Sequence, residues 1–118
     1  MTDTEVSRLR EELLRLYPGA HIKVAPDRAE MVAEIEPGRA VAVIERSVPH
    51  FHKTMTEVYR GLRGTLYVAC GGRGHVLGPG EALTIDPGNV HFARGAGEPA
   101  WIEVLCEPAW TPEDHLIL

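Results

Sequence analysis

The sequence predicts an all-β sandwich or barrel of short strands preceded by one helix. From about residue 21 onward, short runs typical of β-strands alternate with glycine and proline, whereas helical periodicity is confined to the first 16 residues. The nine prolines and twelve glycines lie mostly between these runs, as expected where many strands reverse direction tightly. At 118 residues the chain has the length of one domain whose core is large enough to fold without disulfides or a structural metal.

The expected helix spans about residues 3 to 16. Thr2 and Glu5 have the spacing of a capping box, in which each side chain accepts a hydrogen bond from the backbone N–H of the other. Apolar residues recur at helical intervals from Val6 until Pro18 and Gly19 end the pattern. Residues 1–20 are therefore expected to form a helix and its exit turn.

Nine strands are expected after the helix, followed by a short tail. The strands are predicted at 21–24, 31–35, 39–46, 57–61, 65–70, 74–77, 82–85, 91–93 and 100–107. The barrel would then occupy residues 21–107 of a single 118-residue domain. Residues 108–118 are too rich in proline to be a regular strand throughout, and we expect this tail to pack on the barrel or on a second subunit.

Composition excludes several classes of partner. A net charge of −5 would repel a phosphate backbone, and the chain has no run of lysine and arginine. No apolar stretch reaches the ~20 residues that a membrane-spanning helix needs, and the N-terminal segment is charged and amphipathic. Cys70 and Cys106 are too few and too isolated for a disulfide framework, so both are expected to be core thiols. We expect a cytoplasmic protein that binds neither nucleic acid nor membranes.

Three histidines and one glutamate form the candidate chemical site. In the segment PHFHKTMTEVYRGLRG, His50 and His52 are two residues apart, so their side chains point to the same side of a strand. Glu57 is expected to approach from the neighbouring antiparallel strand, and His91 from a third strand after the tight turn at residues 86–89. Three imidazoles and one carboxylate suit Fe, Mn, Ni, Zn or Cu, so we expect these four residues to bind one divalent metal ion per chain.

These residues resemble the two conserved motifs of the cupin superfamily. The first motif is matched in order and spacing by His50, His52, Glu57 and Gly64, and the second by Gly80, Gly88 and His91. Ile44, Asp86 and Gly95 depart from the family pattern at positions that are not metal ligands in the family. The resemblance implies a small cupin with a double-stranded β-helix barrel of jelly-roll type, a short N-terminal helix and a homodimeric state.

The resemblance also implies small-molecule chemistry, because cupin metal sites serve dioxygenases, decarboxylases, isomerases and polyketide cyclases. We expect a metal-dependent enzyme that acts on a small oxygenated metabolite, of dioxygenase, isomerase or cyclase type. Tyr59 should face the barrel interior near Glu57 and is the candidate catalytic residue, although a purely packing role fits equally well. The competing hypothesis is a non-enzymatic module that binds a sugar or another small ligand, with its metal structural or absent.

Other polar residues are expected to lie outside this site. They are His21, His75, His115, Lys53 and Arg60, all expected at the surface or at strand ends. Gly61 stands where many cupins carry a bulky aliphatic residue, which predicts an enlarged cavity beside the metal.

Overall fold

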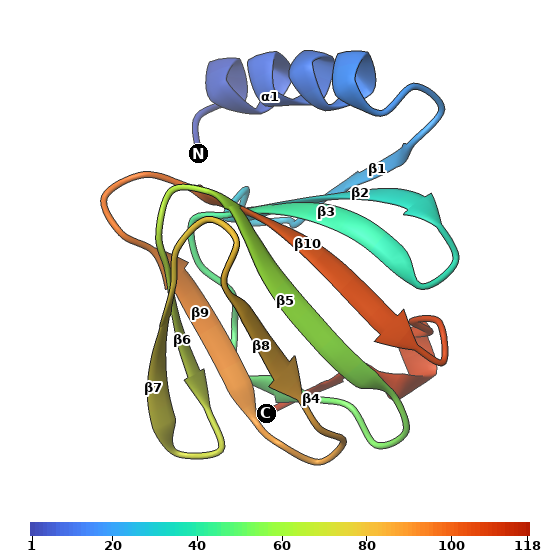
Figure 1. The fold of residues 1–118 in the computed structure, drawn as a ribbon. Helices are drawn as coiled ribbons and strands as arrows, with labels where there is room; N and C mark the ends of the chain where they lie inside the picture. Colours follow the sequence, from blue (N-terminus) through green and yellow to red (C-terminus); the bar gives the residue numbers. More distant parts are fainter.

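The computed structural model describes residues 1–118 as two antiparallel β-sheets with one α-helix on the outside (Figure 1). Its elements are α1 (Asp3–Leu16), β1 (His21–Val24), β2 (Glu30–Glu36), β3 (Arg39–Ile44), β4 (His50–Phe51), β5 (Thr56–Arg63), β6 (Leu66–Cys70), β7 (Arg73–Leu77), β8 (Ala82–Ile85), β9 (His91–Gly95), β10 (Ala100–Glu107), the 3-10 helix η1 (Pro112–Asp114) and β11 (Leu116–Ile117). One sheet has the strand order β1-β2-β3-β10-β5-β8 and the other the order β11-β4-β9-β6-β7. The predicted all-β barrel with an N-terminal helix is confirmed. None of the helices combines the length and apolar character that crossing a bilayer would require.

Helix α1 begins and packs as its sequence predicts. The Thr2 hydroxyl accepts a hydrogen bond from the Glu5 backbone N–H, and the Glu5 carboxylate accepts one from the Thr2 N–H, both at 3.1 Å. Leu13 is fully buried in a cluster with Met31 of β2 and Val43 of β3. Burial of an aliphatic side chain of this size contributes roughly 1.5–3 kcal/mol. The helix therefore covers the outer face of the six-stranded sheet and leaves its inner face free (Figure 1).

The inner face of that sheet and the second sheet enclose the main core. Alternation along β2 separates the two sides, since Met31 and Ala33 face the helix whereas Val32 packs against the inner cluster. The inner cluster holds eleven buried residues from both sheets, among them Leu66 and Ile85. A functional site in this barrel must therefore be built from side chains on the inner face.

The C-terminal tail packs on its own barrel. Strand β11 pairs antiparallel with β4, with Leu116 opposite Phe51 and Ile117 opposite His50. Both strands are only two residues long, and neither was among the nine strands predicted from the sequence. A two-residue strand has no periodicity of its own, so only its tertiary partner reveals it.

Gly61 does not enlarge the cavity, so that expectation was wrong. A Cβ atom at this position would overlap the backbone carbonyl group of Gly78 in the turn between β7 and β8. The turn is held there by two backbone hydrogen bonds of 2.8 Å, from Gly61 N–H to Glu81 O and from Gly80 N–H to Gly61 O. The missing side chain therefore gives room to the backbone of a neighbouring turn, not to a ligand.

Candidate metal centre

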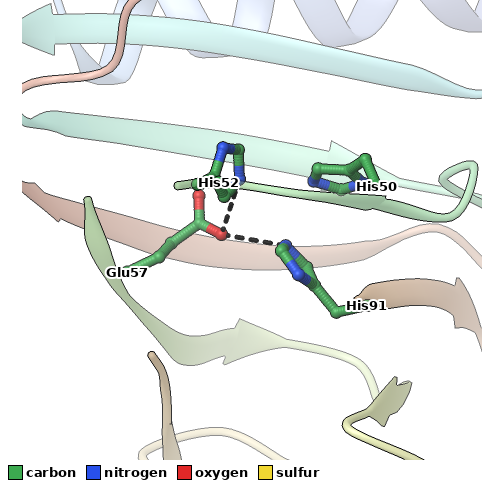
Figure 2. Close-up of side chains that lie close together, drawn as sticks. All are labelled: His50, His52, Glu57 and His91. Carbon is green, nitrogen blue, oxygen red and sulfur yellow. Dashed lines mark hydrogen bonds and ion pairs between the residues drawn. The ribbon is translucent and has the colours of Figure 1, made fainter. Parts of the chain in front are cut away.

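The structure brings the four predicted residues together in the barrel interior. His50, His52, Glu57 and His91 are all buried, and the potential ligand atoms lie within 4.8 Å of one another. His50 on β4 is directly opposite His91 on the adjacent strand β9, and His52 follows immediately after β4. Figure 2 shows the carboxylate of Glu57 between the rings of His52 and His91.

Glu57 reaches the cluster from the opposite sheet, which corrects the expected geometry. It was expected on the strand next to the two histidines, but β4 pairs with β9 and β11 only. Glu57 lies on β5, between β10 and β8 of the six-stranded sheet. The site therefore spans the barrel and depends on both sheets keeping their positions.

Hydrogen bonds to the backbone determine which ring nitrogen of each histidine is free. The Nδ1 atoms of His50, His52 and His91 lie 2.8, 2.6 and 2.9 Å from the carbonyl oxygens of Val48, Asp114 and Asn89, respectively. A carbonyl oxygen only accepts hydrogen bonds, so each Nδ1 must carry the proton. In the neutral rings, the lone pair is then on Nε2, the nitrogen nearer to the cluster centre.

This arrangement of electron pairs fits a bound cation. The Nε2 atom of His91 lies 3.1 Å and that of His52 3.6 Å from the same oxygen, Oε1 of Glu57. The Nε2 atom of His52 is buried and has no hydrogen-bond partner in the protein. Neutral rings would thus direct lone pairs at a carboxylate, an arrangement that a divalent ion would neutralise. These four residues could hold a metal, and the donor set matches first-row transition ions.

Two of the residues are held in the protonation state that metal binding needs. Burial alone would raise the pKa of Glu57, but the rings of His52 and His91, whose Nε2 atoms lie 3.6 and 3.1 Å from its carboxylate, outweigh burial and lower the pKa to about 2. Burial lowers the pKa of His50 to about 4, and the neighbouring histidines add to the shift. At neutral pH, Glu57 is therefore a carboxylate and His50 a neutral imidazole.

Asp114 in the C-terminal tail supports the cluster from outside. Its carboxylate accepts hydrogen bonds from the backbone N–H groups of Lys53, Thr54 and Met55, the shortest being 2.6 Å to Lys53. Its backbone carbonyl accepts the Nδ1–H bond of His52. The tail therefore holds both the loop after β4 and the ring of His52. An aspartate in a proline-rich tail has no sequence pattern that would have indicated this role.

The turn at residues 86–89 has the predicted form and also supports two of the histidines. Gly88 has a φ of 87°, the left-handed conformation that the third position of such a turn requires. Its N–H donates to the carbonyl of His52 at 2.7 Å, and the carbonyl of Asn89 accepts from His91. One turn thereby helps to place two strands of the site.

A cavity of about 520 Å³ opens beside the cluster and has the size of a small-molecule site. Its walls include His50, His52 and Glu57, and Tyr59 of β5 lies beside them. Burial, followed by the charge of Glu57, raises the pKa of Tyr59 well above its usual value. The phenol therefore remains protonated and can act as a hydrogen-bond donor, not as a base.

Two histidines predicted to lie outside the site line this cavity. His115 stacks on the ring of His50 with centroids 4.6 Å apart, and it accepts a hydrogen bond from the indole N–H of Trp110 at 3.3 Å. His21 is on the rim, at the start of the edge strand β1. Neither belongs to the four-residue cluster, as expected, but both line the cavity beside it, which the sequence did not indicate. His75 is on β7, away from the cavity lining, as expected.

Cys106 faces the cavity and is not the core thiol that the sequence predicted. Its sulfur lies 3.9 Å from Oε2 of Glu57, since β10 and β5 place the two residues opposite each other. Burial, and then the charge of Glu57, raises the pKa of this thiol to about 12, so it stays protonated. Cys70 is buried in the inner core, as predicted, and Lys53 and Arg60 are exposed.

The chain belongs to the cupin family, because residues 31–106 match the Cupin domain family. This match covers both halves of the histidine and glutamate cluster. No curated protein matches the chain at a significant level.

Solved structures with the same fold have low sequence identity to this chain. Pac13 from Streptomyces, described as a nucleoside dehydratase, superposes with a TM-score of 0.68 at 13% identity, covering 86% of this chain and 87% of Pac13. KdgF from Halomonas sp. gives a TM-score of 0.67 at 15% identity, covering 79% of this chain and 90% of KdgF. The capsular polysaccharide assembling protein CapF from Staphylococcus aureus gives 0.70 at 13% identity, covering 84% of this chain but only 31% of CapF. These similarities establish the fold and leave the reaction open.

Proposed function

We propose that this cupin binds one divalent metal ion through His50, His52, Glu57 and His91 and acts as an enzyme on a small oxygenated metabolite. One observation carries the proposal: three imidazole lone pairs and one carboxylate converge at the wall of an open cavity. The reaction would be of dioxygenase, isomerase or cyclase type. Pac13 has a similar fold and is described as a nucleoside dehydratase, which supports a small-molecule ligand in this kind of barrel.

The charge of the site favours an anionic or oxygen-rich ligand. A divalent ion with Glu57 as its single carboxylate ligand retains about one net positive charge. When bound, such an ion supplies a Lewis acid that stabilises negative charge on a ligand oxygen. The apolar wall formed by Val32, Ile44 and Val104 would hold the carbon skeleton of the ligand.

The roles of the protein residues follow from their positions. Tyr59 remains protonated beside Glu57 and would donate a hydrogen bond to an oxygen of the ligand. His115, stacked on His50, would limit the access of water to that side of the site. Asp114 and the turn at residues 86–89 would keep the ring planes of His52 and His91 in place.

Elemental analysis of protein purified without a metal-affinity resin tests the metal site. We expect one transition ion per chain in the wild type and at least a ~10-fold lower occupancy in His52→Ala. His75→Ala is the matched control, because it removes a histidine outside the cavity, and should keep wild-type occupancy. Equal metal content in wild type and His52→Ala would remove His52 from the site.

Turnover distinguishes an enzyme from a binding module. The metal-loaded protein would be incubated with panels of hydroxy acids, 2-oxo acids and sugars, and the small molecules followed by NMR. Conversion that disappears in Glu57→Gln supports the enzyme. Ligands that bind without being converted, or a protein that binds no metal after reconstitution, would favour the non-enzymatic module instead.

A further inference from the structure

The cavity contains a second carboxyl group that the four-residue cluster does not use. Glu30 is the first residue of β2 and is half-buried. It has the same parity as Val32, which packs on the inner face, and opposite parity to Met31 beneath the helix. Glu30 and Glu57 therefore line one cavity from different strands of the same sheet.

The Glu30 carboxyl group has no partner within the protein. No hydrogen bond contributes to its pKa, which is determined by burial and by surrounding charges alone. Arg46 also lines the cavity, but it pairs with Asp27 at 3.6 Å and with Glu45 at 3.4 Å. A half-buried carboxyl group without a partner costs free energy unless something else in the cavity contacts it.

The charges that face Glu30 come from several elements. Glu57 on β5 and Asp27 in the turn before β2 are acidic, and His91 on β9 acts in the opposite direction. Tyr59 on β5 is close enough for the charge of Glu30 to affect its own pKa. Burial first, and then the two acidic groups, raises the pKa of Glu30 to about 7, so this group exchanges protons near neutral pH.

The remaining cation that lines this cavity is engaged on the rim. The Nζ atom of Lys23 lies over the ring of Trp110, 5.3 Å from its centroid. Arg46 and Lys23 are thus both engaged by other residues, which leaves the Glu30 carboxyl group available to a ligand in the cavity.

We propose that Glu30 is the second functional carboxyl group of this site, which contacts the ligand held by the four-residue cluster and exchanges a proton with a ligand oxygen. In the donating step, the O–H bond of Glu30 breaks and an O–H bond forms on the ligand oxygen. The resulting carboxylate regains a proton from a second ligand hydroxyl or from water. The inference rests on the proposed function and narrows it to proton-transfer chemistry, that is, isomerisation or cyclisation.

The same geometry indicates the class of ligand. One oxygen function would bind at the metal cluster and a second would reach Glu30, with the carbon skeleton against the apolar wall between them. Hydroxy acids and diols have this pattern. A protonated Glu30 would donate to an anionic ligand, whereas an ionised Glu30 would repel it.

Binding of oxalate to the Zn²⁺-loaded protein tests this contact without an activity assay. Oxalate can bind a metal through two oxygens and present two others to the cavity, and it stays fully ionised near neutral pH. In the wild type we expect the affinity to fall about 10-fold from about pH 6 to about pH 8 as Glu30 ionises. Glu30→Gln keeps a donor that cannot ionise, so its affinity should change less than about 3-fold over that range. Glu34→Gln, on the same face of β2 and also lining the cavity, should behave as the wild type.

Several results would overturn the inference. One is an oxalate affinity that depends on pH in Glu30→Gln as it does in the wild type, and another is an affinity that no longer depends on pH in Glu34→Gln. A third is the absence of oxalate binding to the metal-loaded wild type. None of these results would contradict the metal site itself. Failure to bind Zn²⁺ at all would instead overturn the proposed function and the inference that rests on it. A measurement on wild-type protein avoids any folding defect of the variant: in ¹³C NMR of labelled glutamate carboxyls, oxalate should raise the titration midpoint of Glu30, and an unchanged midpoint would contradict the contact.

Discussion

Replacing Glu30 with glutamine should make the folding stability of this protein less dependent on pH. The folded protein raises the pKa of Glu30 from 4.5 to about 7, chiefly because the group is buried, with Glu57 and Asp27 adding repulsion. Between these two values the folded state holds a proton that the unfolded state has released. The stability that Glu30 contributes through this shift is therefore fully present below about pH 4.5 and is lost as the pH rises toward 7.

The size of the effect follows from the shift. One pKa unit corresponds to about 1.4 kcal/mol, so the free energy of unfolding should fall by up to about 3 kcal/mol across this range. Residual solvent access to a half-buried group reduces the effect, and we expect about 1–3 kcal/mol. Glutamine has nearly the same shape and does not ionise, so the variant should gain this amount over the wild type from about pH 5 to about pH 8.

Urea denaturation of the metal-free protein at these two pH values measures the difference. Fluorescence of the buried Trp101 reports on the core between the helix and the sheet. Glu34→Gln is the control on the same strand face and should show the wild-type change with pH. If wild type and Glu30→Gln lost stability in parallel over this range, Glu30 would not be a buried proton-binding group and the reasoning would be refuted.

The other predictions concern the support of the metal cluster and the packing of the barrel. Asp114→Ala removes the carboxylate that holds the loop after β4 and should weaken metal affinity about 10-fold in a competition titration with a chelator, whereas Glu113→Ala should not. Gly61→Ala forces the turn at Gly78 away from β5 and should destabilise the fold by about 3 kcal/mol, or about 10 °C in Tm. A Cβ atom at Gly74 meets no atom within 4 Å, so the control Gly74→Ala should have little effect. Equal melting temperatures of the two variants would contradict the close approach of Gly61 and Gly78. Metal occupancy should fall as the pH is lowered from about 7 to about 5. Burial opposes protonation of His52, but Glu57 and Asp114 outweigh burial and raise the pKa of His52, so a proton competes with the metal first at this residue. Constant occupancy in dialysed samples would argue against imidazole ligation.

The metal cluster shows how much the spacing of residues in the sequence can predict without a structure. The histidine pair and Glu57 belong to one short segment, and His91 follows a turn whose residues are recognisable, so all four were identified. Their arrangement was not, because Glu57 was assigned to the neighbouring strand. Side-chain parity says which residues share a face of one strand, but it does not say which sheet the next strand joins.

The residues of the site that could not be identified from the sequence share one property. Each acts through a partner that is far away in the chain. Glu30 lines the cavity with Glu57, 27 positions later, and His115 stacks on His50 across 65 positions. Asp114 supports His52 from a tail that has no regular pattern. The sequence of Cys106 and its neighbours predicted a core cysteine on a strand, and only the pairing of β10 with β5 places it opposite Glu57.

By itself, the sequence determined the features that rest on local physics. The capping box of Thr2 and Glu5, the strand runs and the turn around Gly88 each depend on a few neighbouring residues. Tertiary structure alone decided that the cluster bridges two sheets, that the tail closes against β4, and that Glu30 shares the cavity with Glu57. These features depend on long-range strand pairing, in which the energy of a contact depends on residues that only the folded chain brings together.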